Sequence, residues 1–195
     1  IVERTNKKIL WRSNKIMKKS KRSDVDPFIV MDVMESARIA EEKGKDIIHM
    51  EVGQPGTPAP KIAKDYITNE INKNNLGYTV SLGLPALRTK ISNLYGDWYN
   101  LDLNPNRIVV TTGSSGAFIL SFSALFDSGD RVGIGSPSYP SYRQILKSLS
   151  LETVDIQTKL ENRFQPVPED IINNNLNGIL VASPANPTGS MLDKQ

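Results

Sequence analysis

The sequence contains no cysteine and a single histidine, His49, among 195 residues. The absence of cysteine excludes disulfides, thiolate metal sites and cysteine nucleophiles. One histidine is too few for a histidine-based metal cluster or a two-histidine relay, so we expect no metal. The most apolar stretch, 117–126, is interrupted by serines and too short to span a bilayer. No secretory apolar region follows the basic N-terminus, so we expect no signal peptide, no membrane partner and a cytoplasmic location.

Positive charge is concentrated at the N-terminus. The net charge is +3, but residues 1–23 contain nine Lys or Arg and one Glu, so the remaining 172 residues carry −5. A basic arm that binds nucleic acid and a disordered extension both fit this pattern. The extension is the simpler interpretation, so we predict a disordered tail over residues 1–26 and no nucleic-acid partner. Met17 offers an alternative start, which would make residues 1–16 non-native, and they are not expected to form part of the fold.

Residues 27–195 alternate between helical and extended patterns, which predicts a fold of the α/β class. Helices are predicted over 28–43, 60–73, 84–98, 115–126, 141–150 and 169–175, and strands over 47–50, 107–112, 131–135, 152–156 and 178–182. Such alternation indicates βαβ units in a mostly parallel sheet covered on both faces, a three-layer α/β/α arrangement. We predict that residues 27–56 supply the N-terminal helix and strand of a small domain. Residues 57–195 would form part of a large one.

A turn segment follows the last predicted strand. It reads Ser183-Pro-Ala-Asn-Pro-Thr-Gly189, with Asn186 between two prolines. It would place one side-chain amide at the carboxyl end of the sheet, where open α/β folds bind ligands. The amide could donate to an anionic oxygen. Asn-Pro and Thr-Gly are also ordinary turn dipeptides, so a plain turn stays an alternative.

Two other strand ends carry candidate binding groups. Gly113, Ser114 and Ser115 begin a predicted helix, where free N–H groups and hydroxyls suit a phosphate; a simple helix cap is the alternative. The Gly-Lys-Ser/Thr ending of a Walker loop is absent. Tyr139, between Pro137 and Pro140, could present its ring to a flat ligand, or could pack in the core or lie in a surface turn. Together with Asn186, these groups suit a phosphorylated aromatic cofactor.

Over residues 27–195 the chain resembles the pyridoxal-phosphate-dependent aminotransferases of class I/II, fold type I, related to aspartate aminotransferase. The segments that carry the resemblance occur in the family's order: Gly53-Gln-Pro55, Gly77-Tyr78 with Gly83 and Leu87-Arg88, Thr112-Gly-Ser-Ser115, Asp127-Ser-Gly-Asp130, Ser136-Pro-Ser-Tyr139 and Ser183–Gly189. The resemblance implies pyridoxal 5'-phosphate as cofactor, an amino acid and a 2-oxo acid as substrates, and a homodimer.

The resemblance also implies a role for each candidate residue. Ser114 and Ser115, after Gly113, would hold the cofactor phosphate, and Tyr139 would stack on its ring. Asn186 would donate to the phenolic oxygen of the ring. Tyr78 would reach the cofactor of the neighbouring subunit, and Gly53 would line the substrate pocket. Arg88 and Gly83 are expected to be structural, and His49 to be a strand residue without a catalytic role.

The lysine that forms the Schiff base in this family is expected beyond Gln195. Lys147, Lys159 and Lys194 match no part of the family's lysine motif. We therefore predict no catalytic residue in this chain, which alone would be an inactive fragment of an aminotransferase. Its amino-acid substrate is not predicted.

Three alternatives stay open. The intact protein could be another fold type I enzyme, a C–S lyase or a decarboxylase. It could be an aminotransferase-like sensor domain of a transcription regulator. The chain could also be a complete, non-catalytic product with an exposed sheet edge.

Overall fold

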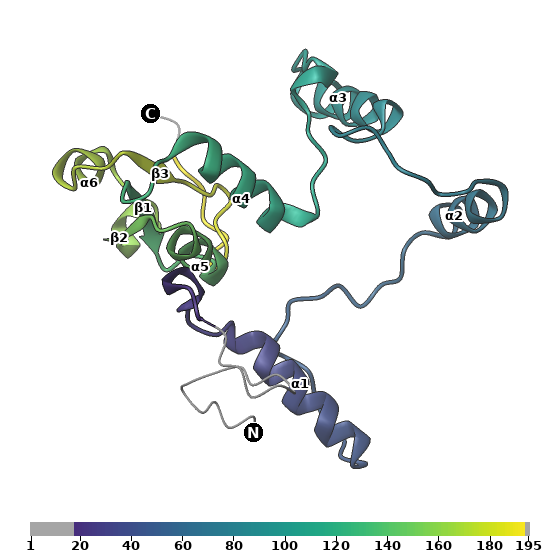
Figure 1. Cartoon of the computed structure of the whole chain (residues 1–195), viewed down its shortest axis with the longest axis horizontal. Coiled ribbons are helices and arrows are strands. Elements are labelled where there is room, and N and C mark those ends of the chain that lie inside the picture. The colour runs from purple at the N-terminus through teal and green to yellow at the C-terminus, as the bar shows by residue number, and fades with distance from the viewer. Residues whose placement is uncertain (1–17, 194–195) are drawn as a thin grey trace. The chain divides into compact units, whose positions relative to one another are not determined.

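The computed structural model describes residues 18–193, in two compact units (Figure 1). The first unit combines the residues up to Glu51 with those from Ser114 onward, and the second consists of Val52–Gly113. Most of the predicted tail, residues 1–17, lies outside the described residues, as does Lys194. The division into residues 27–56 and 57–195 stays a prediction.

The first unit contains a three-stranded parallel sheet. Its strands are β1 (Arg131–Ser136), β2 (Glu152–Gln157) and β3 (Gly178–Leu180), in the order β2-β1-β3. Val132 of β1 pairs with Thr153 of β2 on one side and with Gly178 of β3 on the other. The predicted α/β class with a parallel sheet is confirmed.

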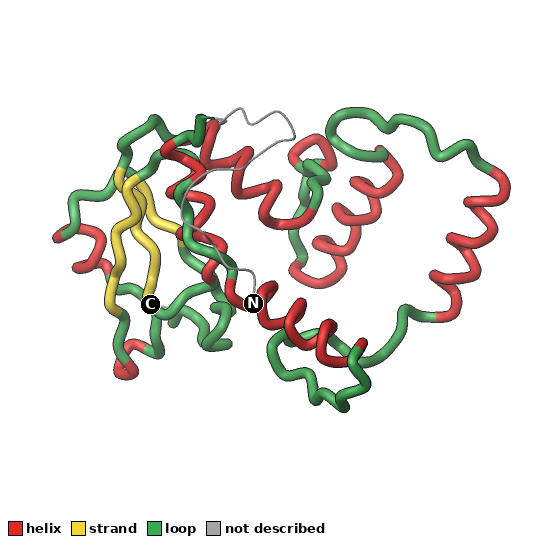
Figure 2. Tube along the Cα trace, turned by 60° about the horizontal axis from the view of Figure 1, so that its bottom comes forward, coloured by secondary structure: helices red, strands yellow, loops and turns green. Residues whose placement is uncertain are grey.

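Helices cover both faces of this sheet. The three helices are α4 (Gly113–Leu125), α5 (Pro140–Ser148) and α6 (Pro168–Asn173). α5 connects β1 to β2 and α6 connects β2 to β3, so the two crossovers run in opposite directions across the sheet. Since such crossovers are right-handed, α5 and α6 lie on opposite faces. Figure 2 shows the short α6 on one side of the yellow strands and the longer helices on the other.

The core of the first unit lies between β1, α4 and α5. It consists of Phe122, Val132, Ile134, Tyr142, Ile145, Leu146 and Leu151, with Ile134 and Leu146 fully buried. The central strand is covered on both faces, which is why it reads as a short apolar run. Gly178 lets α4 approach β3 closely, because a Cβ there would lie 2.4 Å from Cζ of Phe126.

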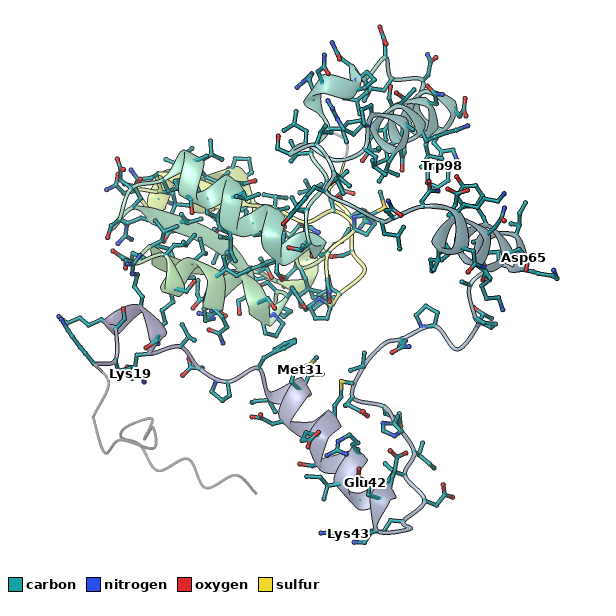
Figure 3. The ribbon with its side chains drawn as sticks, turned by 45° about the vertical axis from the view of Figure 1, so that its right-hand side comes forward. Lys19, Met31, Glu42, Lys43, Asp65 and Trp98 are labelled. Atoms are coloured by element: carbon teal, nitrogen blue, oxygen red, sulfur yellow. The ribbon has the colours of Figure 1, made fainter. Side chains whose placement is uncertain are left out.

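The N-terminal segment of the first unit contains a short 3-10 helix, η1 (Lys21–Ser23), and α1 (Ile29–Glu42). η1 occupies part of the predicted tail and lies against α5. Between them, the ring of Phe28 packs edge-on against Tyr139, with a centroid distance of 6.0 Å. No residue of α1, which lies wholly in the described region, is buried. Figure 3 labels Met31, Glu42 and Lys43 along this segment.

The second unit contains α2 (Lys61–Lys73), α3 (Pro85–Tyr99) and a 3-10 helix, η2 (Pro105–Arg107). Arg88 is buried and donates to the carbonyls of Pro105 and Ile108, both at 3.0 Å. A Cβ at Gly83 would lie 2.5 Å from Cγ2 of Val110. The contacts of both positions therefore hold α3 and its neighbouring loops together. Figure 3 shows Asp65 on α2 and Trp98 on α3 with their side chains directed away from the ribbons.

Two predicted strands are wrong. Residues 47–50 are irregular, and Ile48 and Met50 are more than four-fifths exposed. Residues 107–112 begin at the end of η2 and continue as coil; Val110 donates its N–H to the carbonyl of Leu82 at 3.0 Å. A strand needs a neighbouring backbone along its length, and the described sheet pairs neither segment.

A further 3-10 helix, η3 (Leu160–Asn162), follows β2. No helix within residues 18–193 combines the length and hydropathy of a membrane span.

Candidate functional site

Tyr139 lies just past the carboxyl end of β1, as the N-cap residue of α5. Its ring is half-buried and packs against Tyr142 at a centroid distance of 5.5 Å. The end of β1 is held in place by Thr158, the residue that directly follows β2. The hydroxyl of Thr158 donates to the carbonyl of Ser136 at 2.8 Å. Burial raises the pKa of Tyr142, and the neighbouring Tyr139 raises it further. The ring of Tyr139 is thus held by aromatic neighbours on a defined strand end.

Asn186 lies on the loop that follows β3. This segment, Ser183–Gly189, is called the Asn186 loop below. Its backbone is folded on itself: Gly189 donates to the carbonyl of Ala185 at 2.7 Å, and Ala185 donates to that of Ser190 at 2.8 Å. Asn186 itself is exposed, so its side-chain amide is accessible.

The ends of β1 and β3 meet around a small cavity of about 20 Å³. Asn186 lines it from one strand end and Ser138 from the other, together with Tyr142 and the segment Phe164–Pro166. A space of this size holds about one water molecule. A larger ligand at this edge would therefore lie over the cavity, between Asn186 and the segment that carries Tyr139.

The first turn of α4 carries Ser114 and Ser115, which are both exposed. Gly113 before them has φ = +75°, and the hydroxyl of Thr111 donates to its carbonyl at 2.8 Å. Because the end of α4 leads into the start of β1, α4 runs antiparallel to the strand and its N-terminus lies at the carboxyl edge of the sheet. One turn later, the ring of Phe118 packs against Tyr142 at 5.0 Å.

Three of the predicted groups therefore lie at the carboxyl edge of the sheet, namely the serines of α4, Tyr139 and Asn186, and among these three Asn186 lines the small cavity. Two predicted residues lie in the second unit. Tyr78 is fully exposed there, and a Cβ at Gly53 would meet no atom within 4 Å. A larger hollow, of about 520 Å³, also lies in that unit, along α3 and the loop after it, and includes none of the predicted site residues.

His49 does not belong to this edge. Its Nδ1 lies 2.7 Å from a carboxylate oxygen of Glu51, and its Nε2 lies 2.9 Å from one of Glu41. The hydrogen bonds to Glu51 and Glu41 raise the pKa of His49 to about 9. Among residues 18–193 no group of three or more potential His, Cys, Asp or Glu metal ligands comes together.

Residues 45–195 match the family described as aminotransferase class I and II. The chain belongs to this family. The predicted family is therefore confirmed, together with its fold type I architecture.

Members of the aminotransferase family also resemble the chain individually. The valine–pyruvate aminotransferase of Mycobacterium tuberculosis is 42% identical over 173 residues, which are 88% of this chain and 45% of that protein. A crystal structure of an aminotransferase from the same organism has a TM-score of 0.84 and 40% identity, over 90% of this chain and 46% of that one. The aspartate aminotransferase of Thermus thermophilus gives a TM-score of 0.83 at 26% identity, over 92% and 48%. The chain thus spans about half the length of the curated relatives it matches.

One residue of the site was missed by the sequence analysis. Gln165 is 5% exposed and lines the cavity between the two strand ends. Its side chain bonds to backbone carbonyls 17 and 25 residues further along the chain. No spacing or motif in a single sequence reports such partners.

Proposed function

We propose that the full-length protein is a pyridoxal-phosphate-dependent aminotransferase, which moves an amino group between an amino acid and a 2-oxo acid. The observation that carries this proposal is that α4's first turn, Tyr139 and Asn186 lie at the same sheet edge in a chain of the aminotransferase class I and II family. Pyridoxal phosphate, when bound, supplies an electron sink for bonds at the amino-acid α-carbon. The chain's own contribution is to anchor and orient it.

The N-terminus of α4 fits the phosphate group. The first-turn N–H groups of a helix have no partner within the helix, and the helix dipole favours an anion there by roughly 0.3–2 kcal/mol. Ser114 and Ser115 add two exposed hydroxyls at the same place. This donor set suits a dianion, and no carboxylate lies within residues 111–117 to repel it.

Tyr139 and Asn186 fit the ring of the cofactor. The phenol ring of Tyr139 is fixed by Tyr142 and Phe28, so it can stack on a flat ring without losing much conformational freedom on binding. The amide of Asn186 is accessible and can donate to an anionic ring oxygen, which lowers the proton affinity of that oxygen. Each residue therefore orients a different part of the same planar group.

The homodimer and the remaining site residues belong to the same proposal. The full exposure of Tyr78 leaves its hydroxyl available to the phosphate held by a second subunit. The open surroundings of Gly53 leave its backbone available to a substrate. Oligomeric state is tested by light scattering of the full-length protein, where a monomer that transfers amino groups would refute the shared site.

The proposed activity is tested on the full-length protein. Valine and pyruvate are the first substrates to assay, since a relative 42% identical is named for them. The protein, loaded with pyridoxal phosphate and desalted, is expected to retain the cofactor's visible absorbance and to form alanine from pyruvate only when an amino donor is present. Release of ammonia in place of transfer would refute an aminotransferase in favour of a lyase.

The site assignment is tested separately from the activity. Ser115→Ala is expected to weaken cofactor binding by roughly 10- to 150-fold, the value of one charge-assisted hydrogen bond. Ser123→Ala, at an exposed position two turns later on α4, is the matched control and is expected to bind as the wild type does. Equal affinity of both variants would refute the phosphate site.

A further inference from the structure

Gln165 is a buried polar residue with an unusual set of partners. Its side-chain nitrogen donates to the carbonyl of Ala182 at 3.1 Å and to the carbonyl of Ser190 at 3.0 Å, and lies 3.4 Å from the hydroxyl of Ser190. With 5% of its surface exposed, these contacts are shielded from water. Both N–H donors of the amide group are therefore engaged by backbone carbonyls.

The two carbonyls mark the two ends of the Asn186 loop. Ala182 directly precedes Ser183, and Ser190 directly follows Gly189. One side chain thus ties the segment that enters the loop to the segment that leaves it. The loop's own bonds, between Ala185 and Ser190 and between Gly189 and Ala185, lie inside this closure.

The backbone around Gln165 is itself fixed. The N–H of Gln165 donates to the carbonyl of Asn162 in η3 at 2.9 Å, and Pro166 follows it. The exposed guanidinium of Arg163 pairs with Asp193, which lies beyond the loop. The amide of Gln165 therefore acts from a firm support.

We propose that Gln165 is a positioning residue that holds the Asn186 loop closed and so aims the amide of Asn186 at the cofactor. This inference rests on the proposed function, because it takes Asn186 as the donor to the cofactor ring. The donor chemistry explains the residue type. Two carbonyl oxygens require N–H donors, which glutamine supplies without a charge, whereas methionine has similar volume but no donor.

The first test measures loop closure without any cofactor. In the cofactor-free full-length protein, Gln165→Met is expected to raise the amide exchange rate of residues 185–190 roughly tenfold or more, since two shielded hydrogen bonds are lost. Exchange in α3, none of whose residues lines the cavity beside Gln165, is expected to stay at the wild-type rate. Wild-type exchange in the loop of Gln165→Met would overturn the proposal.

Gln165→Glu provides a variant of the same shape with a titratable group. An ionised carboxylate there would face two carbonyl oxygens, so this neighbourhood and burial raise the pKa of the introduced carboxyl above its usual value of about 4.3. Among titratable and charged groups, Tyr142 lines the same cavity as Gln165, and Arg163, two residues before it, pairs with Asp193. Exchange in the loop, relative to wild type at the same pH, is expected to be fast at neutral pH and to slow as the pH falls. A ratio that does not change with pH would count against the clamp.

The second test links loop closure to the cofactor. In the loaded protein, Asn186→Ala is expected to raise the pH midpoint of the cofactor's visible absorption change, and Gln165→Met is expected to shift it in the same direction by a smaller amount. A shift in Asn186→Ala alone would overturn the positioning role. No shift in either variant, with the loop opened by Gln165→Met, would refute the assigned role of Asn186 while supporting the closure of the loop by Gln165.

Discussion

Replacement of Gly178 by alanine tests the packing of α4 on the sheet. The added Cβ would lie 2.4 Å from Cζ and 2.5 Å from Cε1 of Phe126, so the ring must withdraw by about 1 Å to reach ordinary contact. That ring is not free to do so, because it packs against the buried Phe122 at a centroid distance of 6.1 Å. Overpacking of this kind costs about 1–3 kcal/mol.

The predicted cost is measured by thermal unfolding of the full-length protein followed by circular dichroism. A loss of 1–3 kcal/mol corresponds to a fall in apparent Tm of roughly 2–12 °C, on the scale of domains of 150–250 residues. Gly56→Ala is the matched control, since a Cβ there meets nothing within 4 Å. Its Tm is expected to change little.

A double variant identifies the clash as the cause. Phe126→Leu removes the ring atoms that the new methyl group would meet, so its combination with Gly178→Ala is expected to cost less than the sum of the two single changes. Strict additivity, or a neutral Gly178→Ala, would refute the close approach of α4 to β3.

Three further predictions concern stability and ionisation in the full-length protein. Leu146→Ala removes a fully buried side chain and is expected to lower the free energy of unfolding in urea by about 2–5 kcal/mol, against little change for the exposed Leu125→Ala. Gln144→Met is expected to raise the free energy of unfolding by about 1–3 kcal/mol, because Oε1 of Gln144 is buried without a hydrogen-bond partner among the described residues. A lower free energy of unfolding in this variant would contradict the prediction. The folded-state pKa of His49, about 9, exceeds its ordinary value of 6.5. The stabilisation from its pairing with Glu51 should therefore be complete between about pH 4.5, the ordinary pKa of the glutamate, and pH 6.5, and should disappear as the pH rises through 9. An NMR titration of the imidazole with a midpoint near 6.5 would disprove the pairing.

The sequence predicted the sheet best for β1 and β2, which are consecutive strands along the chain and lie side by side in the sheet. β1 and β2 agree with the predicted strands 131–135 and 152–156 to within a residue, because both are short extended patterns between clear turns. β3 is two residues shorter than predicted, ending at Leu180. The helices predicted over 115–126 and 141–150 correspond to α4 and α5.

The failures have a common physical cause. The segments 47–50 and 107–112 have strand-like composition, but composition cannot supply the neighbouring backbone that a strand requires. For the candidate site, Tyr139 and Asn186 could be proposed from the sequence because glycine and proline mark strand ends. The contacts of Gln165 could not be predicted, because they are made to backbone carbonyl groups, which every residue carries.

The strand order also implies an order of folding. β1 and β2 are joined through α5 alone, so their pairing closes a short loop, whereas β3 returns to the far side of β1 across a separation about twice as long. Short closures cost less entropy and form sooner. During synthesis, the β1–α5–β2 unit of two parallel strands and their connecting helix would therefore form first, with Tyr139 already in place. Asn186 would arrive only when β3 docks, so ligand affinity should not emerge before β3 pairs with β1.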